Sequence, residues 1–178
     1  MKVLIPLVDG FEEIEAMTVV DVLRRAGIDV ITAGLISTVV EGSHKVKVMA
    51  DKRLSEIDYE TVDALILPGG NPGYVNLSNS NRVLSLVKEF EKKKKIIGAI
   101  CGAPYVLAKA GILENRIATI YPGLENKIPR PRTGKLIQDG NIITSQGPGT
   151  AMLFALKLVE LLAGKDKMLK LKRELIIE

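Results

Sequence analysis

The sequence predicts one α/β domain whose central sheet is mainly parallel. Short apolar runs alternate along the chain with amphipathic stretches, which is typical of strand–helix units in a parallel sheet. The chain has 178 residues, 47% of them hydrophobic, and is therefore long enough to bury a substantial core. No repeat, low-complexity segment or linker divides it. We expect residues 1–178 to form a single domain.

The first third of the chain predicts two strands, a helix and a hairpin. The helix carries apolar residues at helical spacing and ends at Gly27. Gly42 and Ser43 mark the turn of the hairpin. In chain order we expect a strand at 2–8, a helix at 12–25, a strand at 28–33 and a hairpin at 39–49.

The middle of the chain continues this alternation. A buried strand at 63–67 runs into a segment rich in glycine and proline, 68–73, which predicts a long loop. Asn79 or Ser80 can cap the next helix. The core face of that helix carries Val83, Leu86, Val87 and Phe90. The apolar run 96–100 predicts a strand, with a helix after it and another short strand at 117–120.

The last third predicts a loop, a hairpin and two helices. Several prolines and glycines make 121–133 a loop, and Asp139-Gly140 is a strong turn dipeptide between strands at 135–138 and 141–144. A very apolar helix at 151–162 is either central or part of an interface. The tail, 166–177, predicts a basic amphipathic helix that covers the domain.

The composition argues against several classes of partner. Basic residues exceed acidic ones by 25 to 21 and cluster at 92–95 and in the tail, but few aromatic residues are present to stack bases, so we expect no specific nucleic-acid partner. No run of about 18 apolar residues predicts a membrane span. The N-terminal apolar run is too short for a secretory signal. One cysteine cannot form an internal disulfide, which fits a reducing cytoplasm.

Cys101, the single cysteine, stands where the predicted strand turns into a helix. Pro104 suits the first turn of that helix, so Cys101 lies at a tight strand–helix elbow. The free N–H groups and dipole of a helix N-terminus favour an anion, so we expect a lowered thiol pKa and a reactive nucleophile. A buried, inert cysteine is the competing interpretation.

Glu15 lies four residues before Val19 and falls on the apolar stripe of the first helix. A carboxyl group that faces the core ionises with difficulty, so the pKa of Glu15 should rise and the group can donate a hydrogen bond at neutral pH. Glu12 projects onto the same stripe, and periodicity does not choose between the two. Alternatively, these acidic residues, with Glu13, merely complement the positive end of the helix.

Two further features could belong to a site. Gly69, Gly70 and Asn71 follow a strand end, where a ligand loop of an open α/β sheet belongs, and their backbone N–H groups could receive an oxyanion. His44, the one histidine, falls in the predicted hairpin, where we expect it to be exposed. One histidine and one cysteine make no zinc constellation, so we expect no metal. No phosphate-binding glycine motif is present.

Five segments together resemble the ThiJ/PfpI family, also called the DJ-one superfamily, and within it the DJ-one and YajL branch. Each segment is a weak indication alone, but they occur in the family's order and span nearly the whole chain. They are residues 10–15 (GFEEIE), 21–27 (DVLRRAG), 67–71 (LPGGN), 99–104 (AICGAP) and 144–150 (TSQGPGT).

The resemblance implies a flavodoxin-like three-layer sandwich, a homodimer, and Cys101 as a nucleophile on a strained elbow. Glu15 would be the protonated carboxyl beside the thiolate, Gly70 and Gly102 would supply the oxyanion N–H groups, and Asn71 and Tyr121 would contact substrate. Family members are credited with glutathione-independent glyoxalase activity, deglycation of methylglyoxal and glyoxal adducts, chaperone-like behaviour and oxidative-stress sensing. The resemblance therefore implies a small reactive aldehyde or a glycated adduct as partner and requires no cofactor.

The sequence departs from the family at several positions. Tyr121 stands where many relatives carry a histidine, and a tyrosine with a pKa near its usual value of about 10 cannot act as a base at neutral pH. No histidine follows Cys101, so a Cys–His triad for proteolysis or amidotransfer is not expected. Gln146 stands where close relatives usually carry arginine. His44 could act only if its hairpin approaches the site of a partner subunit.

Overall fold

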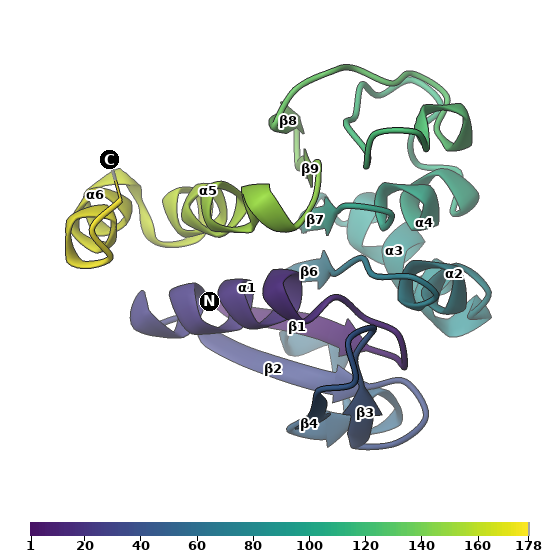
Figure 1. Ribbon diagram of the computed structural model, residues 1–178, viewed down its shortest axis with the longest axis horizontal. Helices are drawn as coiled ribbons and strands as arrows, with labels where there is room; N and C mark the ends of the chain where they lie inside the picture. Colours follow the sequence, from purple (N-terminus) through teal and green to yellow (C-terminus); the bar gives the residue numbers. More distant parts are fainter. Residues whose placement is uncertain (178) are drawn as a thin grey trace.

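A seven-stranded sheet forms the middle layer of the molecule, in the order β5-β2-β1-β6-β7-β9-β8 (Figure 1). This computed structural model describes residues 1–177. Every neighbouring pair is parallel except β8 with β9. The strands are β1 (Lys2–Leu7), β2 (Asp29–Gly34), β5 (Lys52–Arg53), β6 (Ala64–Leu67), β7 (Ile96–Ile100), β8 (Leu136–Asp139) and β9 (Ile142–Ser145).

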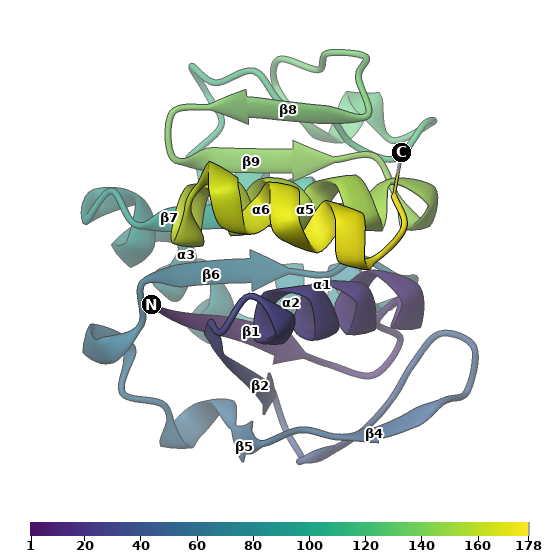
Figure 2. The same ribbon diagram turned by 90° about the vertical axis from the view of Figure 1, so that its left-hand side faces the viewer.

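Helices cover both faces of this sheet, which confirms the predicted flavodoxin-like sandwich. One face carries α1 (Glu13–Arg25), α5 (Ala151–Ala163) and α6 (Lys165–Glu174), which lie in front of the sheet in Figure 2. The other face carries α2 (Gly73–Ser78), α3 (Asn81–Lys92) and α4 (Pro104–Lys109). Two hydrophobic clusters fill the spaces between sheet and helices, and all four residues of β6 are buried.

The last two helices, α5 and α6, form as the sequence predicts. The very apolar α5 packs between the sheet and α6, and α6 buries Leu171 to 2% exposure as a covering helix. None of the helices among residues 1–177 is long and apolar enough to cross a membrane.

A two-stranded ribbon, β3 (Val39–Glu41) with β4 (Lys47–Met49), stands apart from the main sheet. The turn between its strands is tied to the start of α1, because the backbone N–H of His44 donates to the Glu13 carboxylate at 2.8 Å. The predicted hairpin is confirmed, and its tip is brought to the same edge of the molecule as the strand ends.

One sequence prediction of local structure is wrong, and two elements were missed. Residues 117–120 form no strand, only an isolated bridge between Ala118 and Pro131. The Thr119 N–H donates instead to the Thr144 side chain at 2.9 Å, so a ladder to the sheet cannot continue. The sequence also missed α2, which begins at Gly73 where only a loop was expected, and the two-residue strand β5.

Candidate active site

Cys101 occupies the elbow between β7 and α4. Its φ of 62° lies in the left-handed region, which a residue with a side chain rarely adopts. Backbone hydrogen bonds hold it there: its N–H donates to the carbonyl of Ser145, and its carbonyl accepts from the N–H of Tyr121, both at 2.9 Å. The half-buried thiol therefore stands at the carboxyl edge of the sheet.

Glu15 reaches the thiol from α1. Its side chain is fully buried, one carboxylate oxygen accepts the Gly69 N–H at 2.8 Å, and the carboxyl also contacts the Cys101 thiol. The other oxygen, Oε1, is buried without a hydrogen-bond partner. Burial, helped by the nearby charge of Glu12, raises the pKa of Glu15 to about 7, which confirms the predicted rise.

The loop after β6 closes around this pair. A Cβ built on Gly69 would lie 2.6 Å from the Cβ of Cys101 and 2.8 Å from Glu15 Oε2, so only glycine leaves room for the contact. The backbone N–H groups of Gly70 and Gly102 both face the sulfur and stabilise its charged form. The structure thus brings Gly70, Gly102, Glu15 and Cys101 together.

The expected lowering of the Cys101 pKa is wrong. Burial and then the negative charge of Glu15 raise the pKa of the thiol to about 12, and the two N–H groups offset only part of this. The helix that was expected to help has six residues and begins only at Pro104. A proton on Glu15 removes the neighbouring charge but not the effect of burial, so the thiol ionises more easily when Glu15 is protonated than when it is charged.

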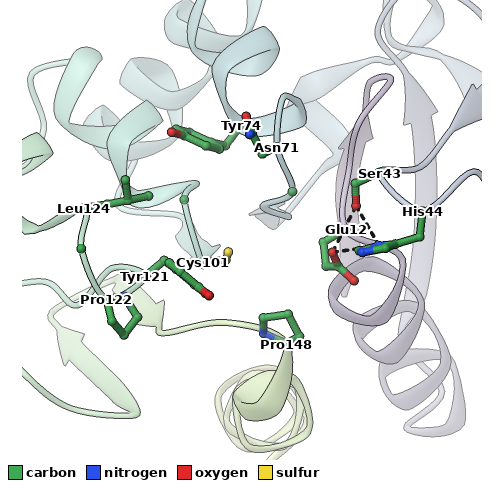
Figure 3. Close-up of a pocket in the computed structure, with 13 residues that line it drawn as sticks. Glu12, Ser43, His44, Asn71, Tyr74, Cys101, Tyr121, Pro122, Leu124 and Pro148 are labelled. Atoms are coloured by element: carbon green, nitrogen blue, oxygen red, sulfur yellow. Dashed lines mark hydrogen bonds and ion pairs between the residues drawn. The ribbon is translucent and has the colours of Figure 1, made fainter.

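A cavity of about 550 Å³ opens above the thiol. Its wall includes Asn71 and Tyr121, as the resemblance implied, and Tyr121 is 47% exposed (Figure 3). Gln146 lines a separate cavity of about 230 Å³ instead. Sequence reasoning missed Tyr74, whose ring lies where a Cβ on Gly102 would be and stands edge-on to Tyr105. Nothing in the sequence around Tyr74, which follows the loop residue Pro72 by two positions, indicates this packing.

His44 lines this cavity too, from the side opposite Tyr121 (Figure 3). Its ring is 72% exposed, as predicted, and its Nδ1 lies 3.1 Å from Glu13 and 3.4 Å from Glu12. The hydrogen bond to Glu13 and the charge of Glu12 raise the pKa of His44. His44 therefore belongs to the rim of its own chain's cavity, and no local pattern in the sequence indicates this position.

Glu12, Glu13 and His44 are the group among residues 1–177 whose ligand atoms lie close enough to hold a metal, within 4.8 Å of one another. All three side chains are already engaged with one another and with the Ser43 hydroxyl. Cys101 lines the same cavity but lies apart from this group (Figure 3).

The fold and the elbow together define an α/β sandwich of flavodoxin-like type with a cysteine held at the carboxyl edge of its sheet. The model of the DJ-1/PfpI family matches residues 1–161, and the chain belongs to this family. It is 39% identical to the protein dj-1beta of Drosophila melanogaster over 98% of this chain and 96% of that protein.

Two further relatives bear on the chemistry. The chain is 36% identical to the glutathione-independent glyoxalase DJR-1.2 of Caenorhabditis elegans, over 93% of this chain and 89% of that protein. The solved structure of oxidized Toxoplasma gondii DJ-1 superposes with a TM-score of 0.95 at 37% identity, covering 99% of this chain and 98% of the other. These matches confirm the resemblance to the DJ-one branch.

Proposed function

We propose that this protein is a cysteine-dependent enzyme that converts methylglyoxal, glyoxal or their adducts to hydroxy acids without glutathione. The observation that carries the proposal is the contact of the buried Glu15 carboxyl with the Cys101 thiol at the bottom of an open cavity. The resemblance to a glutathione-independent glyoxalase supports the same chemistry. No metal or organic cofactor is required by it.

In the first step the Cys101 sulfur adds to the aldehyde carbon. A carbon–sulfur bond forms, the carbonyl π bond breaks, and the oxygen becomes an alkoxide. Glu15, with its pKa near 7, takes the thiol proton during attack and passes it to that oxygen, giving a hemithioacetal. The N–H groups of Gly70 and Gly102 stabilise the negative oxygen before it is protonated.

In the second step the ionised Glu15 removes the hydrogen of the former aldehyde carbon as a proton and returns it to the neighbouring ketone carbon. The proton of the hemithioacetal hydroxyl moves to the ketone oxygen, so that the first oxygen becomes the thioester carbonyl and the second becomes the alcohol. The aldehyde carbon is oxidised to a thioester by two electrons, and the ketone is reduced to an alcohol by the same two. Water then cleaves the thioester, which frees the thiol and a hydroxy acid, lactate from methylglyoxal. Asn71 and Tyr121, which flank the cavity, would orient the substrate through hydrogen bonds.

Lactate release from methylglyoxal by the reduced protein, in the absence of glutathione, tests this proposal. We expect turnover by the wild-type protein and none by Cys101→Ala. A wild-type protein with a demonstrably reduced thiol that releases no lactate would overturn it.

The alternative is a redox sensor or chaperone-like stress protein that uses oxidation of Cys101. A sulfinate on Cys101 would accept hydrogen bonds from the Gly70 and Gly102 N–H groups and from protonated Glu15. The structure of an oxidized relative and the tyrosine at position 121 favour this reading. Peroxide titration followed by mass spectrometry supports it if sulfinate forms selectively in a protein without turnover.

We also propose that the protein works as a homodimer in the cytoplasm. Ile14 on α1 and Val39, Val46 and Met49 on the ribbon are apolar and at least 51% exposed, and the Val46 N–H donates to the Glu13 carboxylate at the start of α1. A second copy would bury this surface. Sedimentation analysis tests the assembly. The lone cysteine fits a reducing compartment.

A further inference from the structure

The wall of the Cys101 cavity carries a carboxylate but no permanent positive charge. Among residues 1–177, the side chains that line it include the carboxylate of Glu12 and the imidazole of His44 but no lysine or arginine. A second carboxyl, Glu15, lies under the thiol. An anion that enters this cavity therefore meets negative charge without a permanent cation to receive it.

Glu12 is the residue that maintains this charge. It is 7% exposed, immediately precedes α1, and its carboxylate lies 3.1 Å from the Ser43 hydroxyl and 3.4 Å from His44 Nδ1. The hydroxyl carries no charge, and His44 stands between two carboxylates, those of Glu12 and Glu13. Even a protonated His44 therefore leaves the group of three with a negative net charge.

The charge of Glu12 also reaches the reacting groups. It is one of the causes that raise the pKa of Glu15, although no hydrogen bond joins the two carboxyl groups. A charge that interacts with Glu15 also interacts with a ligand bound at the neighbouring Cys101. Glu12 is itself buried, so water screens its charge incompletely.

We propose that Glu12 is a specificity-determining residue that makes the Cys101 cavity admit uncharged aldehydes and reject anionic ones. The same repulsion favours product release, because an uncharged oxoaldehyde and water become a hydroxy acid anion and a proton. The inference rests on the proposed function for the identity of the substrate. The charge selection itself can be measured at Cys101 without any turnover.

Alkylation of the single cysteine provides that measurement. Iodoacetamide and iodoacetate react alike: the sulfur attacks the methylene carbon and iodide leaves. They differ in that iodoacetate is an anion. The ratio of their two rate constants cancels any change in the fraction of thiolate. Mass spectrometry of the intact protein gives both rates, and a small free thiol gives the reference ratio.

We expect the wild-type protein to favour iodoacetamide about tenfold more than the free thiol does, and Glu12→Gln to remove most of that preference. Asp21→Asn removes the same charge from the exposed far end of α1 and should change nothing. Added salt should reduce the preference of the wild-type protein for iodoacetamide over iodoacetate, which tests the inference without a variant. A wild-type ratio equal to that of the free thiol, or one that Glu12→Gln leaves intact, overturns it.

Turnover separates this inference from the proposed function. Phenylglyoxal is uncharged and 4-carboxyphenylglyoxal is an anion, and both are oxoaldehydes. We expect wild-type kcat/KM to favour the uncharged compound and Glu12→Gln to reduce the difference by about fivefold. Equal kcat/KM values would overturn the inference alone. Absence of turnover with both compounds, together with the alkylation preference, would overturn the proposed function and leave the charge selection in place.

Discussion

The buried carboxyl of Glu15 contacts the thiol of Cys101, although the first comes from helix α1 and the second from the elbow after strand β7. The Gly69 N–H holds one carboxylate oxygen at 2.8 Å, while Oε1 remains without a partner in a buried position. Because the pKa of Glu15 is raised to about 7 and that of Cys101 to about 12, the pair holds two protons below pH 7 and one proton, on the thiol, above it.

Glu15→Gln should lower the pKa of Cys101. The charge of Glu15 is one of the causes that raise that pKa, and glutamine has the same shape without the charge. The pH dependence of Cys101 alkylation by iodoacetamide measures the shift, with Asp21→Asn as the control. An unchanged titration would show that Glu15 does not act on the thiol.

The same substitution should alter how stability depends on pH. The pKa of Glu15 is raised from its ordinary 4.5 to about 7 in the folded protein, so the folded state binds a proton more tightly than the unfolded one. Stability from this group is therefore full below about pH 4.5 and is lost as pH rises to about 7, by roughly 3 kcal/mol at about 1.4 kcal/mol per pKa unit.

Denaturant unfolding of wild type and Glu15→Gln across this range isolates the effect. Groups with lowered pKa values, such as Asp51 and Glu91, contribute the opposite dependence but are shared by both proteins. We expect the difference in unfolding free energy to shift in favour of Glu15→Gln as pH rises. A difference that stays constant with pH contradicts the raised pKa.

Gly69→Ala should disrupt the site more than the fold. The added methyl group would press on Cys101 and Glu15, and overpacking of this kind typically costs about 1–3 kcal/mol. Gly149→Ala is the matched control, since a Cβ there meets nothing within 4 Å. Lactate release and thermal unfolding are measured on both. Full activity in Gly69→Ala would show that the close approach is unimportant.

Tyr121→Phe should raise KM for methylglyoxal by about fivefold and leave kcat nearly unchanged, because it removes one hydrogen-bonding group from the cavity wall without changing the ring. A large fall in kcat would instead indicate that the hydroxyl takes part in proton transfer. Steady-state kinetics distinguish the two.

Much of the fold follows from local patterns. The strands at β1, β6 and β7, the apolar α5 and the Asp139-Gly140 hairpin occur where periodicity and turn residues place them. The prediction of a strand at 117–120 is wrong because the backbone there pairs with other partners than a neighbouring strand. The Thr119 N–H donates to the Thr144 side chain, and Ala118 bridges only to Pro131 in the following loop. Helix α2 is short and begins at a glycine, so its apolar residues are too few to show a helical period in the sequence.

The candidate site also combines features that local sequence predicts with features that it does not. The elbow at Cys101 and the core-facing position of Glu15 can be seen in the sequence, because each depends on residues nearby in the chain. The direction of the shift in the Cys101 pKa cannot be seen there, since it depends on how deeply the thiol is buried and on a carboxyl contributed by another element. His44 on the rim likewise depends on the ribbon being tied to α1 through Glu13.

The most direct test of the central claim follows isotope-labelled methylglyoxal on Glu15→Gln protein by NMR. We expect the Cys101 thiol still to add to the aldehyde, because the substitution lowers the thiol pKa and water can protonate the oxygen, so a hemithioacetal signal accumulates. Lactate release should fall by about 100-fold to 10,000-fold, because no group remains to move the proton between the two carbons. Cys101→Ala should show neither signal nor lactate. Release of lactate by Glu15→Gln at the wild-type rate would contradict the account.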